Sequence, residues 1–255
     1  MWIFACVTFV ISLITLFVRK HFLKKLQALS SVQESSPTQI IQMHDKISKE
    51  LGAINELVCI QAQWYCENPV QTPWSKTNCL SYEAKQYKEY EQQYQERQQN
   101  GTVINRTRRD SSLVFSENRS ANFELHDAQN RILVESQNAN FEPMRSIHEH
   151  FVPVMNQFSN FLIAQRKELG DRYQEQAFMP SDGQTLTVIG LFTSRNGKPV
   201  ICEGGDLWLV STKSKRQLVK ENSSWAFWMG WVSLIFLIVS VVVGILAILG
   251  VEFKG

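Results

Sequence analysis

Three histidines carry the side chains best suited to hold a transition metal. His148 and His150 flank Glu149, so a β-strand through this segment would present both imidazoles on one side. His126 stands next to Asp127, and imidazole with carboxylate is a ligand set for zinc and related metals. A metal site would require the fold to bring His126 close to the other pair. Because an unsupported histidine pair is more often a solvated surface feature, we expect no metal and no other cofactor.

The cysteines offer a second route to chemistry. There are five of them: Cys6, Cys59, Cys66, Cys79 and Cys202. No two have the short spacing typical of zinc ligands, and the odd number indicates no disulfide framework. Cys79 or Cys202 could act as a nucleophile beside a histidine, but neither lies in a recognisable catalytic sequence. We therefore interpret the cysteines mostly as small buried hydrophobic residues and assign no catalytic residue.

Charged and aromatic residues elsewhere are assigned structural roles. Glu175 stands just before a hydrophobic strand and is expected to pair with Arg172 at the domain edge. Arg106 and Arg108 flank Thr107, and Arg109 follows; the three arginines are expected on a solvated strand face, with binding to anionic lipid or an acidic partner as the alternative. Four aromatic residues are expected in core or cross-strand contacts: Tyr82, Tyr87, Phe115 and Phe123. The net charge of +2 is too small to indicate a nucleic-acid partner.

Two apolar segments are long enough to anchor these residues at a membrane. Residues 2–18 carry no charge and would rise roughly 26 Å as a helix, slightly less than the roughly 30 Å hydrocarbon core. Residues 225–251 begin with Trp225, Trp228 and Trp231, which suit a membrane interface, and continue without a charge. A cleaved signal peptide is the alternative for the first segment, but its positive charge would normally precede the apolar run. We expect two transmembrane helices.

Basic side chains gather at the domain-side ends of both segments. They are Arg19, Lys20, His21, Lys24, Lys25, Lys213, Lys215, Arg216 and Lys220. Because cytoplasmic loops carry an excess of Lys and Arg, we expect the central domain in the cytoplasm and both chain ends on the opposite face. Contacts with lipid headgroups would form in either orientation. Ser240 and Gly244 form a small-xxx-small pair that would let the second helix pack closely on another.

The segment between the spans predicts a β-rich domain. Ser36, Pro37 and Gln39 form a capping pattern for a helix that ends near Gly52. Asn100-Gly101 predicts a hairpin turn, although the helix formers of residues 83–98 favour a helix locally. The hairpin arms are placed at 79–95 and 103–116, shorter strands at 122–126 and 131–135, a helix or extended arm at 146–168, a second hairpin at 185–192 and 198–202 around Asn196-Gly197, and a last strand at 207–212.

Several motifs follow one another in a distinctive order. They are PVQTPWSKTNCLSYEAKQY, SANFELHDAQNRILV, YQEQAFMPSDGQTLTVIGLF, NGKPVI and LWLVST. Their order between two apolar segments, over roughly residues 36–250, resembles the GIDE-type or "beside a membrane" (BAM) domain family, which includes the membrane domain of the ubiquitin ligase MULAN. The matching positions are Pro73, Cys79, Phe123, Leu125, Asp127, Glu175, Gly183 and Gly190.

The resemblance also limits what can be carried over. In the ligases of that family the activity belongs to a RING finger after the second span, which needs about eight Cys and His ligands, whereas only VEFKG follows here. We therefore expect no ligase activity. The resemblance implies a membrane-held domain of barrel or sandwich character that serves in partner binding, sensing or membrane organisation.

The expected fold is an α+β membrane protein in which two transmembrane helices flank one β-rich, barrel or sandwich-like domain with a few helices. Its parts are the first span at 2–18, a basic segment and linker helix at 19–52, the domain at 53–222 and the second span at 225–251. The leading hypothesis is a two-pass, non-enzymatic module whose partners are the lipid bilayer and a protein. The alternatives are a membrane-anchored enzyme that uses His126, His148 and His150 in metal or hydrolase chemistry, and a subunit of a larger membrane assembly.

Overall fold

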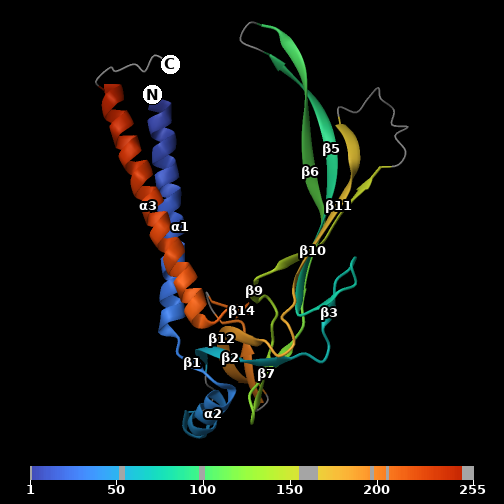
Figure 1. Ribbon diagram of the computed structural model, residues 1–255, viewed down its shortest axis with the longest axis vertical. Helices are drawn as coiled ribbons and strands as arrows, with labels where there is room; N and C mark the ends of the chain where they lie inside the picture. Colours follow the sequence, from blue (N-terminus) through green and yellow to red (C-terminus); the bar gives the residue numbers. More distant parts are fainter. Residues whose placement is uncertain are drawn as a thin grey trace.

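The computed structural model describes residues 2–51, 55–97, 101–154, 166–195, 198–204 and 207–248. Its two long helices are α1 (Trp2–Ser31) and α3 (Lys215–Ile248). They run antiparallel along one another, so the start of α1 and the end of α3 lie at the same end of the molecule (Figure 1). Helix α1 continues well beyond the apolar residues that predicted it, because the lysines, leucines and alanine that follow are also good helix formers.

Helix α2 (Pro37–Leu51) begins where the capping pattern predicted. The hydroxyl of Ser36 accepts a hydrogen bond from the backbone N–H of Gln39 at 3.2 Å. The Gln39 side chain accepts one from the backbone N–H of Ser36 at 2.9 Å, which completes the capping box. On the inner face of the helix, Ile40 is 2% exposed and belongs to the main core.

The main domain is a five-stranded barrel. Its strands are β2 (Glu56–Tyr65), β7 (Phe123–His126), β8 (Arg131–Val134), β13 (Lys198–Cys202) and β12 (Thr185–Arg195). They pair in that order, and the barrel closes because β12 also pairs with β2. This is a five-stranded Greek-key arrangement, as in OB-folds. Short strands extend the sheet: β1 (Glu34–Ser35) lies beside β2, β14 (Leu209–Ser211) beside β12, and β9 (Asn140–Glu142) beside β14.

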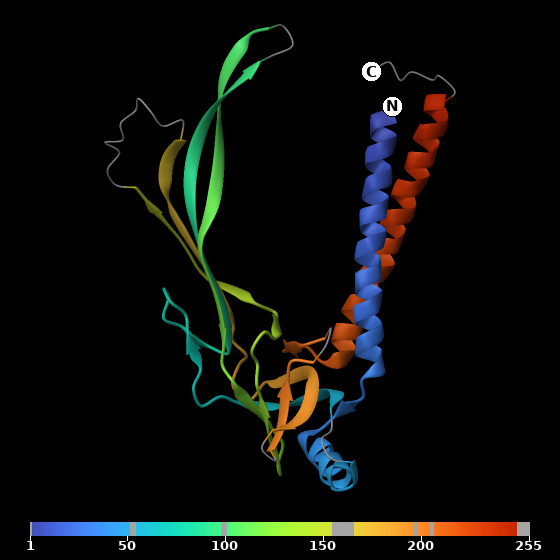
Figure 2. The same ribbon diagram turned by 180° about the vertical axis from the view of Figure 1, so that it is seen from behind.

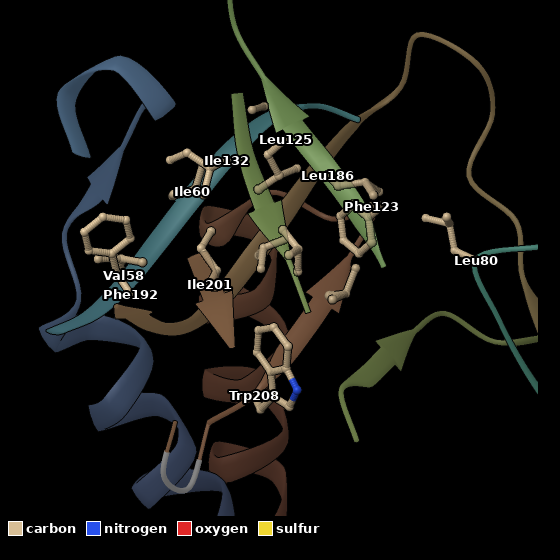
Figure 3. Close-up of a cluster of buried hydrophobic side chains, with 14 of the residues drawn as sticks. Val58, Ile60, Leu80, Phe123, Leu125, Ile132, Leu186, Phe192, Ile201 and Trp208 are labelled. Atoms are coloured by element: carbon tan, nitrogen blue, oxygen red, sulfur yellow. The ribbon is translucent and has the colours of Figure 1, made fainter. Parts of the chain in front are cut away.

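The barrel core follows the alternation of its strands. Phe123 and Leu125 of β7 and Ile132 and Val134 of β8 are at most 2% exposed, while their neighbours in the same strands are more exposed. These side chains meet Ile60, Leu186 and Ile201 inside the barrel (Figure 3). Trp208 closes one end, and its ring lies so close to Gly190 that a Cβ there would fall 2.4 Å from it. Glycine at 190 is therefore required by packing.

A second sheet stands on the barrel, and we call it the arm. Its strands, in order, are β10 (Arg145–Pro153), β11 (Arg166–Phe178), β5 (Ser81–Arg97) and β6 (Val103–Ser120). The arm is made from two insertions into the barrel, one between β2 and β7 and the other between β8 and β12. Figures 1 and 2 show it running beside the α1–α3 pair. A small ladder of β3 (Val70–Gln71) and β4 (Asn78–Cys79) lies at its base.

The arm settles two ambiguities in the sequence. Residues 83–97 form a strand despite their helix-favouring composition, because β5 pairs with β11 on one side and with β6 on the other. Residues 145–153 and 166–168 are strand, so the helix considered for that segment is wrong there, while 155–165 lie outside the described residues. Gly101 has a φ of +84°, as the predicted turn requires. Asn100 and the Asn196-Gly197 turn lie outside the described residues.

The helices are joined to the barrel by a second hydrophobic cluster. Leu29 and Val32 at the end of α1 and Leu218 of α3 pack with Cys59 and Ile189 of the barrel. The ammonium of Lys215 also donates a hydrogen bond to the backbone carbonyl of Val32. The base of the helix pair and the barrel therefore form one packed unit.

Candidate functional site

The α1–α3 pair presents an apolar outer surface. Both helices are long and apolar enough to cross a membrane. In the most apolar 18-residue stretch of each helix, only 11% (α1) and 6% (α3) is buried inside the protein. Polar groups face inward instead. Ser12 is 1% exposed and Ser233 is 3% exposed. The Ser12 hydroxyl donates to the Ser233 carbonyl at 3.1 Å, and the Ser233 hydroxyl donates to the Ser12 carbonyl at 3.2 Å.

The glycines of α3 show where this helix closely approaches its neighbour. A Cβ built at Gly244 would meet nothing within 4 Å, so this half of the predicted small-xxx-small pair makes no close approach. Close approach occurs instead at Gly230, where a Cβ would lie 3.2 Å from the Nε atom of Arg19. Gly230 thus leaves room for the Arg19 side chain to cross the neighbouring helix.

Aromatic and basic side chains mark one level of the helix pair. The rings of Phe22 and Trp225 stack with centroids 6.2 Å apart. Trp225, Trp228 and Trp231 are 54%, 60% and 50% exposed, so all three present their rings outward. These rings lie near the domain-side ends of both apolar segments, where the sequence predicted a membrane interface.

The predicted interfacial cations divide into two groups. Lys25 pairs with Glu142 of β9 at 3.3 Å, Lys213 pairs with Glu221 at 2.6 Å, and Lys215 is engaged by α1. These three side chains hold parts of the protein together. The side chains of Arg19, Lys20, Lys24 and Arg216 are exposed.

The three candidate metal-binding histidines lie on two different sheets. His148 and His150 share a face of β10, with ring centroids 6.1 Å apart, whereas His126 is on β7 in the barrel. Within the described part of the chain, no group of three or more His, Cys, Asp or Glu side chains is placed to hold a metal ion.

Asp127, the candidate neighbour of His126, joins α2 to the barrel. One of its oxygens accepts a hydrogen bond from the backbone N–H of Thr38 in the first turn of α2 at 2.8 Å. The other accepts from the N–H groups of Gln129 and Asn130, each at 3.0 Å. Desolvation alone would raise the pKa of Asp127, but these hydrogen bonds outweigh it and lower the pKa to about 2. The side chain therefore acts as a helix cap and turn former.

Glu175 does not pair with Arg172, so that prediction is wrong. Glu175 is fully buried, and its two oxygens accept hydrogen bonds from the backbone N–H groups of Trp74 at 2.7 Å and Ser75 at 3.0 Å. Arg172 pairs with Glu89 at 2.9 Å. Arg172 and Glu175 are three positions apart in β11, so their side chains point to opposite faces of the arm. Glu175 thus fastens the loop between β3 and β4 to the base of the arm.

In the sequence this loop belongs to the first family motif, around Pro73, but no role was assigned to Trp74. Trp74 places its ring edge-on to Tyr173, with centroids 5.0 Å apart, and to Phe115 at 5.9 Å. The Thr72 hydroxyl accepts a hydrogen bond from the backbone N–H of Thr77 at 3.0 Å, which closes the turn. The cluster of Ser, Thr and Pro around a tryptophan is the signal that could have identified a packed turn.

The two candidate nucleophiles are buried and poorly activated. Burial, and next the charge of Glu175, raise the pKa of the Cys79 thiol to about 11. Burial also raises the pKa of Cys202. Both thiols therefore stay protonated near neutral pH, where a nucleophile needs a thiolate. Cys59 is buried as well, whereas Cys6 is exposed on α1 and departs from the expected buried role.

One face of the arm carries a row of two apolar or aromatic ends, a tyrosine and an arginine, one residue from each of its four strands. Phe151 of β10 pairs with Arg172 of β11, Arg172 with Tyr87 of β5, and Tyr87 with Leu113 of β6. Directly paired residues point to the same side of a sheet. The guanidinium of Arg172 lies 5.2 Å from the centre of the Tyr87 ring. Leu113 is 54% and Phe151 41% exposed at the two ends. We call these four residues the arm row.

Many of the other arm side chains are charged and pair with one another, although Val103, Val114 and Val152 are also exposed. Arg106 pairs with Glu96 at 2.6 Å and Arg109 with Glu91 at 3.3 Å. Arg106, Arg108 and Arg109 are all exposed, as predicted for a solvated strand face. Large exposed apolar side chains in the middle of such a surface are candidates for a binding site.

Comparison with known proteins shows that the chain matches one protein family model. The family model GIDE, described as E3 ubiquitin ligase, matches residues 91–244, which is more than half of the 255 residues. The match takes in most of the arm, the barrel strands from β7 onward and most of α3. No curated protein matches the chain, and no solved structure does.

Proposed function

Because this chain belongs to the GIDE family, we propose that it is a membrane-anchored binding module whose arm holds a protein partner. In this proposal α1 and α3 span the bilayer as an antiparallel pair, and the barrel lies at the membrane surface. The basic residues at the domain-side ends favour the cytoplasmic face for the domain, with both helix ends across the membrane.

The main support for this proposal is the arm row. It joins two exposed apolar residues to an aromatic ring and an arginine on one face of a rigid sheet. Tyrosine and arginine are enriched among residues that dominate binding energy, and exposed apolar side chains contribute by burial in a partner. Neither enzyme chemistry nor a metal is needed for this role.

Photo-crosslinking in the native membrane tests the proposal. A photoreactive amino acid at Leu113 should give a discrete adduct with a protein, and the adduct should be lost when Phe151→Ser removes the other end of the row. Val152→Ser is the matched control, because Val152 is the next residue of β10, is 43% exposed and points to the opposite face. Absence of an adduct from Leu113, or equal loss with both substitutions, would contradict the proposal.

Membrane insertion has its own test. The full chain should remain in the membrane pellet after alkaline carbonate extraction, because the outer faces of both helices are apolar. Release into the supernatant would disprove the anchor and leave the arm proposal to be judged separately.

A part in ubiquitin ligation is the second candidate, favoured by the description of the family model. The arm would then hold a substrate or a component of the ligation machinery. Ubiquitin transfer by the purified full chain with activating and conjugating enzymes would support it. Transfer unchanged by adding the chain would count against a direct ligase role.

A further inference from the structure

A cavity of about 420 Å³ lies where α1 meets the barrel. On one side it is lined by His21, Lys24, Lys25 and Ala28 of α1, and on the other by Asn140, Trp208 and two leucines. We propose that this cavity binds the phosphate-bearing headgroup of an anionic phospholipid, an inference that rests on the proposed membrane insertion.

The level of the cavity fits a headgroup. Arg19 follows the last apolar residue of the first segment, and Phe22 stacks on Trp225 at the start of the second. At 1.5 Å per helical residue, His21 to Lys25 lie roughly 3 to 9 Å beyond Arg19. The polar layer on each side of a bilayer is roughly 5 to 8 Å thick. The basic wall of the cavity therefore lies at the level of the lipid phosphates.

The polar wall has the groups that bind a phosphate. Two lysine ammoniums and an imidazole come from α1, an amide comes from Asn140, and the described residues lining the cavity include no carboxylate. Glu142 lies beside the cavity and orients two of the donors: its Oε1 accepts from Lys25 Nζ at 3.3 Å and from Asn140 Nδ2 at 3.0 Å. A phosphate there would receive charge-assisted hydrogen bonds from side chains that are already positioned.

The opposite wall is apolar and rigid. Trp208 is 7% exposed, and its indole N–H donates to the carbonyl of Gln137 at 2.9 Å. Its ring also lies on Gly190, which leaves it no room to move toward the barrel. Such a wall suits the glycerol and upper acyl carbons of a lipid, which a free phosphate lacks. Exposed lysines alone would offer charge without this wall.

Native mass spectrometry of the purified full chain in detergent tests the inference. We expect one phosphatidylglycerol to bind per chain in preference to phosphatidylcholine, and inorganic phosphate not to displace it. Lys24→Gln with Lys25→Gln should weaken the binding about tenfold or more, since each lysine near a membrane contributes to anion attraction. Ala28→Phe should weaken it similarly by filling the cavity without changing its charge.

The matched control is Lys20→Gln with Arg216→Gln. It removes the same number of positive charges from exposed positions that do not line the cavity, and it should change the affinity by less than about twofold. Circular dichroism and thermal unfolding confirm that each variant is folded.

Three results would overturn the inference. Equal binding of both phospholipids would show that no anionic headgroup is selected, and equal losses in the control and the lysine variant would show general charge attraction. Displacement by inorganic phosphate would assign the cavity to a soluble phosphate instead of a lipid. A chain that withstands carbonate extraction but fails any of these tests keeps the proposed membrane anchor and loses only the lipid site.

Discussion

Both oxygens of the Glu175 carboxylate are occupied by backbone N–H groups of the loop between β3 and β4. The loop donates from Trp74 and Ser75, whose peptide groups would otherwise be unpaired against the arm. Because the carboxylate is fully buried, its desolvation must be offset by these short hydrogen bonds and by the packing of Trp74. A carboxylate suits the position because it accepts at both oxygens.

Replacing Glu175 with glutamine tests that role. Glutamine keeps one acceptor but turns an N–H₂ toward a backbone donor, so we expect a loss of about 2 to 4 kcal/mol in the free energy of unfolding. Chemical unfolding of the purified chain in detergent measures it. Glu149→Gln is the control, because Glu149 is exposed on the same sheet and should cost less than about 0.5 kcal/mol. Equal effects would refute the assigned role.

Asp127 predicts a pH dependence of stability. Its pKa in the folded protein is about 2, below the ordinary value of 3.8. A depressed pKa stabilises the fold above the ordinary value, and this contribution is lost as the pH falls from about 4 to about 2. It amounts to at most about 2 kcal/mol, reduced because the side chain is partly exposed to solvent.

The comparison of wild type with Asp127→Asn isolates this contribution. We expect the difference in melting temperature between the two proteins to be larger at pH 7 than at pH 2.5. At pH 2.5 the wild-type carboxylate is partly protonated and loses part of its stabilising effect. A difference independent of pH would mean that the Asp127 charge does not support the α2 cap.

At the scale of elements, α1 and α3 meet through polar side chains within otherwise apolar helices. Ser12 and Ser233 donate to each other's backbone carbonyls. Interhelical hydrogen bonds of this kind contribute roughly 0.6 kcal/mol in a membrane. They determine the register of the α1–α3 pair more than the strength of its association, because a shift of either helix would leave two hydroxyls facing hydrocarbon.

Cysteine crosslinking checks that register. In a chain with Cys6→Ser, Ser12→Cys with Ser233→Cys should form an intramolecular disulfide on mild oxidation. Ile14→Cys with Ile235→Cys should not, because Ile14 and Ile235 are 57% and 55% exposed on the outer surface. Crosslinking of the second pair alone would show that the helices pack in another register.

At the scale of the whole molecule, the arm runs beside the helix pair (Figures 1 and 2). The arm carries charged side chains along its length, including Lys85, Arg106 and Arg109. Charged and hydrogen-bonding groups of a sheet with open edges are unfavourable in hydrocarbon. If α1 and α3 span a bilayer, the arm must therefore diverge from them to remain in water.

Spin-label distances measure this divergence. With labels at Thr107 on β6 and Ile14 on α1, and with Cys6 and Cys66 replaced by serine, the distance in lipid nanodiscs should exceed that in the structure. A pair within the arm, Thr107 and Ser146, should keep its distance. An unchanged distance from Thr107 to Ile14 would mean that the helices do not lie in the bilayer.

Several parts of the structure could be predicted because their signals are local. The capping box at Ser36 and the long apolar runs at either end of the chain depend only on neighbouring residues and on helix geometry. The strand at β5 required one non-local argument, since its helix formers had to yield to two neighbouring strands. The partner of Glu175 was mispredicted, because a residue nearby in sequence was preferred to a loop about 100 residues away.

By itself, the sequence predicted two apolar helices, a β-rich segment between them, and the antiparallel pairing of β5 with β6 and of β12 with β13. The closed barrel, the assembly of the arm from two insertions and the arm row were decided only by the tertiary structure. The physical reason is the separation along the chain over which each signal acts. Hydrophobic period, capping and turn chemistry act within a few residues, whereas the cavity beneath α1 and the row across the arm exist only once strands distant in the chain have paired.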